Sequence, residues 1–256
     1  FSTCGVCIHC QTGAYNLCLQ RRGIGYYLNG AFAKYIVVPQ GRVHPLPDSV
    51  DYISGALTEP LACTVHGALE LTGVSAGDVV LVTGPGTIGL LTAQVAKAEG
   101  GTVVVAGTSI DEHRLQVAKT IGADYTVNGE EVDVVEMLKD MTKGRGADVV
   151  LECSGSGSGA RLCLAAVRRG GRYGQIGLFG KPIEIDFEQI CYKEVAVSGS
   201  FSQKWSAWDR SLRLVDRGLI QMKPLVSHIL PLTDWEEAFR KFESKEGLKL
   251  VLEPVD

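Results

Sequence analysis

Long hydrophobic runs and an excess of basic residues are both missing from this sequence. No stretch approaches the roughly 18 uninterrupted apolar residues of a membrane-spanning helix, and we expect no signal peptide at its start. The chain has 25 Lys and Arg against 29 Asp and Glu, a formal net charge of −4. Domains that bind nucleic-acid phosphates are usually basic, so we expect neither a membrane nor a nucleic acid as partner.

Aromatic residues are also sparse, at 7%, and charged residues make up 21%. Hydrophobic residues reach 45% of the 256 residues, which is enough apolar material for a sizeable core and argues against a disordered chain. A chain of this length forms one large domain or two of ordinary size. The composition therefore indicates a globular protein.

The cysteines lack the regular spacing that is typical of small secreted domains stabilised by disulfide bonds. Four of the eight cysteines lie in the first 18 residues, whereas Cys63, Cys153, Cys163 and Cys191 are scattered. Scattered thiols are typical of small buried side chains that stay reduced. We therefore expect a reducing, cytoplasmic location.

The clustered cysteines have the spacing C-x2-C-x2-C-x7-C and are Cys4, Cys7, Cys10 and Cys18. Tetrahedral Zn²⁺ needs four thiolates around one centre, and short spacings let a single loop fold around the ion. Four cysteine ligands leave no position for water or substrate, so the site is expected to be structural. Disulfides and an iron–sulfur cluster remain as alternatives. The zinc lobe would span about residues 1–20.

Short apolar runs alternate with helical segments between residues 62 and 200. We predict strands at 79–83, 102–106, 124–127, 148–153, 171–177 and 195–200, and helices at 88–99, 111–121, 131–142 and 159–168. Continuous Val- and Leu-rich strands that alternate with helices indicate a parallel sheet covered on both faces. The fold class is therefore α/β, with a doubly wound, six-stranded Rossmann domain over residues 62–200.

The remaining segments, 1–61 and 201–256, are assigned to a second domain. Residues 1–61 lack helical periodicity and are expected to be irregular or β structure, with an extended run at 33–39 (AKYIVVP). After residue 200 we predict helices at 206–217 and 234–243 and strands at 225–230 and 248–253.

A glycine-rich loop follows the first strand of the Rossmann segment. Gly84, Gly86 and Gly89, with Thr87 and Ile88 between them, form G-x-G-x-x-G at the start of a helix. The first glycine permits a tight turn, the second lets the backbone approach a pyrophosphate, and the third allows close helix–strand packing. The free N–H groups of the helix start would bind the phosphates.

The end of the second strand bears on the choice of cofactor. An acid about 20 residues after the glycine loop holds the ribose 2′-OH of NAD, but the sequence here is Gly107-Thr108-Ser109. Thr108 and Ser109 can donate hydrogen bonds, and His113 or Arg114 could reach a 2′-phosphate. NADP is therefore favoured over NAD. The alternatives are that Asp111 bends back to serve as the acid, and that Arg114 is merely solvated.

One carboxylate lies where the two regions join. Glu59 precedes Pro60 in the segment LTEPLACTVH, and we expect it to be held in a turn at a cleft between domains. By composition alone, such a glutamate is more often a capping or solvated residue.

Together these motifs resemble the zinc-containing medium-chain dehydrogenase/reductase family of the alcohol dehydrogenase superfamily. The resemblance rests on the four-cysteine lobe, the Glu-Pro-Leu segment, GPGTIG, the segment 228–232 (HILPL) and the closing 248–251 (LKLV). It is strongest to the polyol branch, which is typified by sorbitol (L-iditol) 2-dehydrogenase. It implies that the second domain is a partial GroES-like, mostly β catalytic domain.

The resemblance also assigns roles to individual residues. The four clustered cysteines match the structural zinc ligands, and Glu59 matches a catalytic-zinc position. Gly177 and Leu178 would flank the nicotinamide, and Lys249 would lie near the cofactor phosphates. The family's first catalytic-zinc ligands lie before the cysteine lobe. The chain opens on Phe1 close to that lobe, so we expect an N-terminal truncation and an inactive fragment.

The implied activity is zinc-dependent hydride transfer between a small polyol or secondary alcohol and NAD(P). Zinc would lower the pKa of the substrate hydroxyl, and the nicotinamide would take the hydride. The alternatives are an amino-alcohol dehydrogenase of the threonine type and a non-catalytic NADP-binding module. The family forms homodimers or homotetramers, often through the last Rossmann strand, here near 195–200.

Overall fold

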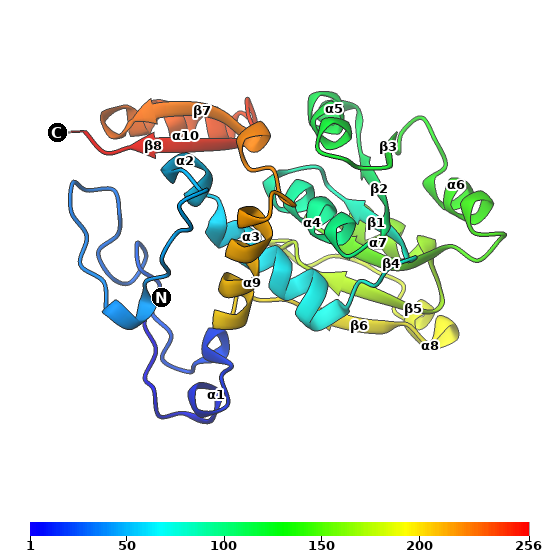
Figure 1. Cartoon of the computed structure of the whole chain (residues 1–256). Coiled ribbons are helices and arrows are strands. Elements are labelled where there is room, and N and C mark those ends of the chain that lie inside the picture. Colours follow the sequence, from blue (N-terminus) through cyan, green and yellow to red (C-terminus); the bar gives the residue numbers. More distant parts are fainter. Residues whose placement is uncertain (256) are drawn as a thin grey trace.

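A computed structural model describes residues 1–255 of the chain. Its centre is a sheet in which all neighbouring strands are parallel, in the order β3-β2-β1-β4-β5-β6 (Figure 1). The strands are β1 (Val79–Thr83), β2 (Thr102–Gly107), β3 (Tyr125–Asn128), β4 (Ala147–Glu152), β5 (Val167–Gln175) and β6 (Ala196–Gly199). This is the strand order of a doubly wound Rossmann sheet, so the predicted fold class is confirmed.

Helices cover both faces of the sheet. They are α3 (Thr58–Val65), which continues as a π-helix over His66–Thr72, α4 (Thr87–Ala98), α5 (Glu112–Thr120), α6 (Val134–Met141), α7 (Gly157–Ala166) and α8 (Glu188–Lys193). Side chains of a strand point alternately to opposite faces. Val80 and Val82 accordingly pack with the core around α3 and α4, whereas Leu81 packs with the core around α6 and α7. Burial on both faces explains the unbroken apolar runs.

The second part of the chain contains fewer regular elements. They are α1 (Ile8–Gln11), α2 (Tyr52–Gly55), α9 (Trp205–Asp216), β7 (Val226–Pro231), α10 (Trp235–Glu243) and β8 (Lys249–Glu253), with short 3-10 turns. Strands β7 and β8 form a parallel pair, and α9 packs against α3. Figure 1 shows β7, β8 and α10 on the same side of the molecule as the first 50 residues. Among residues 1–255, no helix is both long and apolar enough to cross a membrane.

Residues 33–39 are irregular, one of the two forms predicted for this region; no neighbouring strand pairs with them, and Val37 is 97% exposed. Two local predictions are wrong. Glu59 lies in the first turn of α3 rather than in a turn before Pro60, since a helix tolerates proline where the N–H has no partner. Strand β5 begins at Val167, not 171, because Val167 is buried and pairs with Ala147 of β4.

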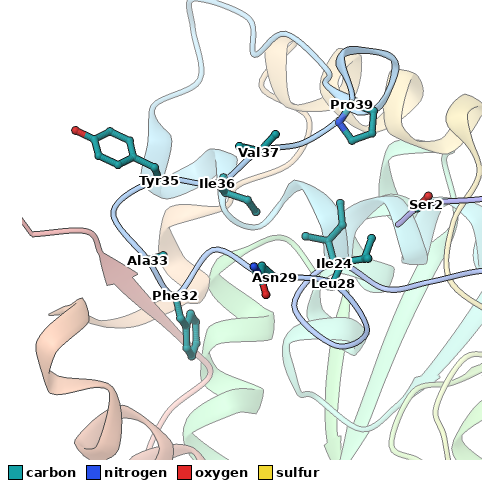
Figure 2. Close-up of a pocket in the computed structure, with 11 residues that line it drawn as sticks. Ser2, Ile24, Leu28, Asn29, Phe32, Ala33, Tyr35, Ile36, Val37 and Pro39 are labelled. Atoms are coloured by element: carbon teal, nitrogen blue, oxygen red, sulfur yellow. The ribbon is translucent and has the colours of Figure 1, made fainter.

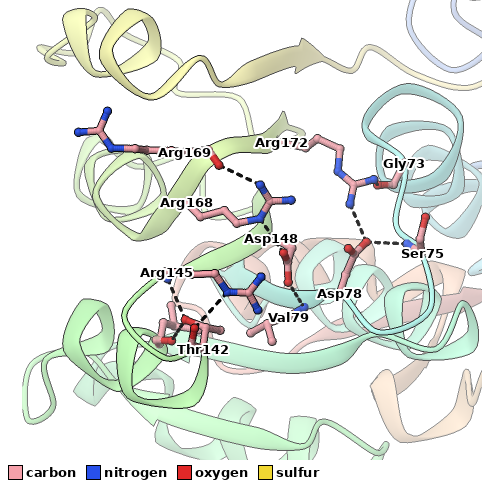
Figure 3. Close-up of polar contacts among 12 residues, drawn as sticks. Gly73, Ser75, Asp78, Val79, Thr142, Arg145, Asp148, Arg168, Arg169 and Arg172 are labelled. Carbon is pink, nitrogen blue, oxygen red and sulfur yellow. Dashed lines mark hydrogen bonds and ion pairs between the residues drawn. The ribbon is translucent and has the colours of Figure 1, made fainter.

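Ion pairs tie the amino ends of the central strands together (Figure 3). The carboxylate of Asp148, in β4, accepts hydrogen bonds from the Val79 N–H at 2.9 Å and from Arg168 Nε at 2.6 Å. Arg172 of β5 pairs with Asp78 at 2.7 Å. Burial raises the pKa of Asp148, but the Val79 and Arg168 donors outweigh it, so this pKa lies below its usual value.

Replacing Asp148 with asparagine is expected to lower the free energy of unfolding by about 2 kcal/mol at neutral pH, the scale of a charged hydrogen bond. A carboxylate with a lowered folded-state pKa stabilises fully above its unfolded pKa of about 3.9, and this stabilisation is lost as the pH falls below it. The difference between the wild type and D148N should therefore shrink below about pH 4. Urea unfolding at several pH values measures this, and a difference that grows on acidification would contradict it.

Candidate cofactor and metal sites

The sulfur atoms of the four clustered cysteines converge on one point. Cys7 and Cys10 Sγ are 3.6 Å apart, Cys4 and Cys18 Sγ are 3.7 Å apart, and all four lie within 4.8 Å of one another. A tetrahedron with Zn–S bonds of about 2.3 Å has edges of roughly 3.8 Å. The four thiols therefore fit a single zinc ion, whereas a cluster of several irons would hold them farther apart.

Backbone N–H groups around the cysteines favour the thiolate form that metal ligation requires. The Cys7 N–H donates to Cys4 Sγ, and the N–H groups of Cys4 and Gln20 donate to Cys18 Sγ, each at 3.4 Å. Hydrogen bonds, first from the Cys10 backbone, lower the pKa of Cys7 to about 6, whereas burial raises the pKa of Cys10 to about 11. All eight cysteines are free thiols in the structure, which gives no support to the disulfide alternative.

The cysteine lobe is attached to the loop that follows β6. Asn16 Nδ2 donates to the Phe201 carbonyl at 2.8 Å, and Arg21 Nη2 donates to Ser202 Oγ at 3.0 Å. The Arg21 guanidinium also lies 5.2 Å from the centre of the Phe201 ring. These contacts therefore hold the loop that joins the central sheet to α9 against the cysteine lobe.

The glycine-rich loop leaves open space over its middle glycine. Gly84 has φ +84°, and a Cβ there would lie 2.5 Å from the Ser154 Cα. A Cβ on Gly89 would lie 1.9 Å from the Gly84 carbonyl oxygen, but one on Gly86 would meet nothing within 4 Å. The outer glycines are thus required by the fold, whereas the middle one borders a cradle that a ligand could fill.

The start of α4 faces this cradle. Its N-cap is Gly86, and no side chain caps the helix, so the first-turn N–H groups and the positive end of the helix dipole are available to an anion. Thr87 Oγ1 donates to the Leu248 carbonyl at 3.1 Å. This contact brings Lys249, the next residue, close to the loop.

Polar side chains surround the tip of β2. Asp111 accepts hydrogen bonds from the Thr108 N–H at 3.2 Å and its hydroxyl at 3.0 Å. Arg114 pairs with Asp111 at 3.3 Å and donates to the Gly247 carbonyl at 3.1 Å. The Ser109 N–H donates to Glu130 at 3.0 Å, and the Ser109 side chain, followed by this N–H, lowers the pKa of Glu130. Asp111 therefore does bend back toward the tip, with its carboxylate engaged by Thr108 and Arg114.

The residues predicted to flank the nicotinamide lie at the same edge of the sheet. A Cβ on Gly155 would be 2.5 Å from the Leu178 carbonyl oxygen, and one on Gly177 would be 2.4 Å from the Gly155 N. The turns after β4 and β5 therefore touch backbone to backbone. Leu178 itself is 78% exposed, so its side chain is accessible to a ligand.

Glu59 is exposed in the first turn of α3. Its Oε1 lies 3.5 Å from Cys63 Sγ, and Cys63 also contacts Gln203 Oε1 at 3.3 Å. Burial, and then the charge of Glu59, raises the pKa of Cys63. Within residues 1–255, the four-cysteine lobe is the one group of three or more metal-binding side chains. The described residues around Glu59 therefore do not make a complete zinc site.

Two of the histidines have other partners. His44 stacks on Trp205 and Trp208, with ring centres 4.0 and 4.9 Å away. His66 is buried, and its Nδ1 lies 2.6 Å from Glu70. Among the described residues, no group of three or more metal-binding side chains combines a histidine with Glu59.

A cavity of about 600 Å³ lies away from the glycine-rich loop. Figure 2 shows its lining, which comes from the irregular segment 24–39 together with Ser2 and includes Ile24, Leu28 and Phe32. Because the segment contributes no residue of the loop or of the β2 tip, the cavity is not the cofactor site.

One buried carboxylate at the cofactor-binding edge of the central sheet was not predicted from the sequence. Glu152, the last residue of β4, is fully buried and contacts the turns that carry the predicted cofactor residues. The available signal was a carboxylate that ends an otherwise apolar strand, in the run DVVLEC.

Comparison with known proteins agrees with this geometry. Residues 87–217 match the family model described as zinc-binding dehydrogenase, and residues 1–48 match the alcohol dehydrogenase GroES-like domain. The chain is 46% identical to a sorbitol dehydrogenase of Halalkalibacterium halodurans over 257 residues, which covers 100% of this chain and 75% of the relative. It is 36% identical to an L-threonine 3-dehydrogenase of Symbiobacterium thermophilum, covering 98% and 72% of the two chains.

Solved structures give the same result. A zinc-binding dehydrogenase from Sinorhizobium meliloti 1021, described as bound to NADP, superposes with a TM-score of 0.85 at 33% identity. The match covers 93% of this chain and 70% of the other. The chain therefore belongs to the zinc-binding dehydrogenases, in the sorbitol dehydrogenase-like branch of the medium-chain dehydrogenase/reductase family.

Proposed function

We propose that this protein oxidises a small polyol or secondary alcohol by transferring hydride to NAD(P). The observation that carries the proposal is the open cradle over Gly86 at the uncapped start of α4, beside the tip of β2. A panel of polyols and secondary alcohols, assayed with either cofactor by the absorbance of the reduced nicotinamide, tests it. Activity confined to other substrate classes would contradict the substrate assignment.

The chain's own residues would bind and orient the cofactor. Bound nicotinamide supplies the hydride acceptor. The N–H groups of Thr87 and Ile88 would hold the pyrophosphate, and Gly177 and Leu178 would border the nicotinamide ring. Lys249 would add positive charge near the phosphates. Such fixed contacts align the reacting carbons and keep water out.

A preference for NADP over NAD is part of the proposal. It is supported by the Thr108 and Ser109 hydroxyls and by Arg114, whose guanidinium is held at the tip of β2. Arginine recognises phosphate through several N–H donors at once. The NADP-bound relative from Sinorhizobium agrees with this preference. The carboxylate of Asp111, placed at the same tip, is the basis of the alternative preference for NAD.

Replacing Arg114 with leucine should weaken NADP⁺ binding roughly tenfold, or about 1.4 kcal/mol, and leave NAD⁺ binding almost unchanged. Lys119→Gln, which removes an exposed charge from the same helix, is the matched control. Fluorescence titration with both cofactors measures the effect. Tighter binding of NAD⁺ than of NADP⁺ by the wild type would overturn the preference.

The zinc held by Cys4, Cys7, Cys10 and Cys18 is proposed to be purely structural, since four thiolates would complete its coordination. Glu59 is proposed to face the catalytic zinc position of the family, at the end of α3 that contacts the loop after β6. Gly67, further along the same helical segment, packs against Ile176, which precedes the nicotinamide-flanking turn. The helical segment that begins near Glu59 therefore also contacts the end of the sheet beside the proposed nicotinamide pocket.

An amino-alcohol substrate of the threonine type is the second candidate. It is favoured by the 36% identity to an L-threonine 3-dehydrogenase. Turnover of L-threonine but not of polyols would establish it in place of the first.

Two further assignments complete the proposal. We assign residues 62–200 to the dinucleotide-binding domain and residues 1–61 and 201–256 to the GroES-like catalytic domain, and we expect a reducing, cytoplasmic environment.

We also propose a homodimer or homotetramer that pairs through β6, because β6 lies at the edge of the sheet and Val197 is 47% exposed. Sedimentation analysis gives the oligomeric state, and a monomer at micromolar concentration would contradict it.

A further inference from the structure

The side chain of Glu152 lies below the cofactor edge of the sheet and is completely buried. Its Oε1 accepts hydrogen bonds from the Ser154 N–H at 2.9 Å, the Ser154 hydroxyl and the Thr83 hydroxyl at 3.4 Å. Its Oε2 accepts from the Gly155 N–H at 3.1 Å and from Gln175 Nε2 at 2.7 Å. All five partners are donors, an arrangement that suits an ionised carboxylate, which can only accept.

No positive side chain neutralises this carboxylate. Among the residues that the structure describes, no Lys, Arg or His nitrogen lies within 4.0 Å of a Glu152 oxygen. Five dipolar donors can hold a buried charge, but they do not cancel its field. Because water does not reach the group, this field is only weakly screened.

The partners of Glu152 come from three segments that border the proposed cofactor site. Thr83 immediately precedes the glycine-rich loop, Ser154 and Gly155 form the turn after β4, and Gln175 ends β5. A Cβ on Gly177 would lie 2.6 Å from Glu152 Oε2. The carboxylate is therefore in direct contact with the backbone expected to border the nicotinamide.

We propose that Glu152 is a positioning residue that joins the three turns of the nicotinamide pocket and, through its buried negative charge, favours the oxidised cofactor over the reduced one. This inference rests on the proposed function, in particular on the nicotinamide lying beside Gly177. The oxidised nicotinamide ring is positively charged and the reduced ring is neutral. A fixed negative charge beneath the pocket therefore attracts one redox form and not the other. The adenosine and phosphate groups are the same in both forms and do not alter this difference.

A purely structural role would give a different result. Loosening the three turns would weaken the binding of both redox forms to a similar extent, since both forms use the same pocket. Loss of the charge would act on the oxidised form alone. The ratio of the dissociation constants of NADP⁺ and NADPH therefore separates the two roles.

The test uses the full chain with its zinc and three variants. In Glu152→Gln the charge is lost with little change of shape, and the NADP⁺/NADPH ratio of dissociation constants should rise roughly tenfold, as expected for charges several ångströms apart in a protein interior. Glu152→Asp keeps the charge on a shorter side chain, so both constants should rise while their ratio stays within about twofold of the wild type. Ser154→Ala removes one donor without changing the charge, and its ratio should likewise be unchanged.

Fluorescence titration gives the dissociation constants, and far-UV circular dichroism confirms that each variant folds. An unchanged ratio in E152Q would overturn the proposal. If E152Q does not fold, a ratio in E152D that departs severalfold from the wild type would overturn it instead. Failure of the wild type to bind either dinucleotide would contradict the proposed function itself, so the two failures are distinguishable.

Discussion

Replacing Gly86 with valine is expected to weaken the binding of either nicotinamide dinucleotide at least about a hundredfold while the protein remains folded. A Cβ at this position would meet no protein atom within 4 Å, and the φ of −76° and ψ of −177° of Gly86 suit an L-residue. The branched side chain would instead occupy the space where the backbone should approach the pyrophosphate. Fluorescence titration and thermal unfolding measure the two effects.

Gly89→Val is the control that separates an effect on cofactor binding from an effect on folding. Its side chain would collide with the Gly84 carbonyl oxygen, so G89V should lower the melting temperature markedly, whereas G86V should change it little. If G86V bound the dinucleotide as tightly as the wild type, the pyrophosphate would have to lie elsewhere.

Replacing Cys18 with serine is expected to reduce the zinc content from one ion per chain to almost none. Structural zinc bound by four ligands supplies roughly 10–16 kcal/mol of binding free energy that is also folding free energy, and loss of one thiolate removes much of it. The lobe should lose its protection from hydrogen exchange over residues 1–22. The six-stranded sheet should keep its protection, because its core contains no residue of the lobe.

Cys191→Ser is the matched control, since Cys191 is exposed and distant in sequence from the lobe. Metal analysis should find its zinc content unchanged. Iron in place of zinc in the wild type, or full zinc retention in C18S, would contradict the assignment of the lobe.

The central sheet was predictable because its strands carry a strong local signal. Val80, Leu81 and Val82 are fully buried on alternating faces, and burial on both faces forces a continuous apolar run. The glycine motif was recognisable for a similar reason: Gly84 and Gly89 are required by close backbone contacts, and their spacing around Gly86 is preserved in the sequence. The four cysteines predicted to bind zinc also lie close together in the chain, so one loop could bring them to a point.

The features that the sequence did not predict depend on contacts between segments that are distant in the chain. Segment 33–39 has the composition of a strand, but a strand forms only where a partner pairs with it. The helix that contains Glu59 is stabilised by packing on α9, which lies about 140 residues later and gives no local signal. The hydrogen bond from Arg114 to the Gly247 carbonyl and the burial of Glu152 likewise arise from tertiary structure, although each residue was visible in the sequence.

The central claim is that the first N–H groups of α4 bind the pyrophosphate of a nicotinamide dinucleotide. Amide-resolved NMR of the zinc-loaded wild type, recorded during titration with NADPH, tests it most directly. The account predicts large, saturable shifts of the Gly86, Thr87 and Ile88 amides. Saturable binding that leaves these amides unmoved, or no binding of either dinucleotide by the folded protein, would contradict it.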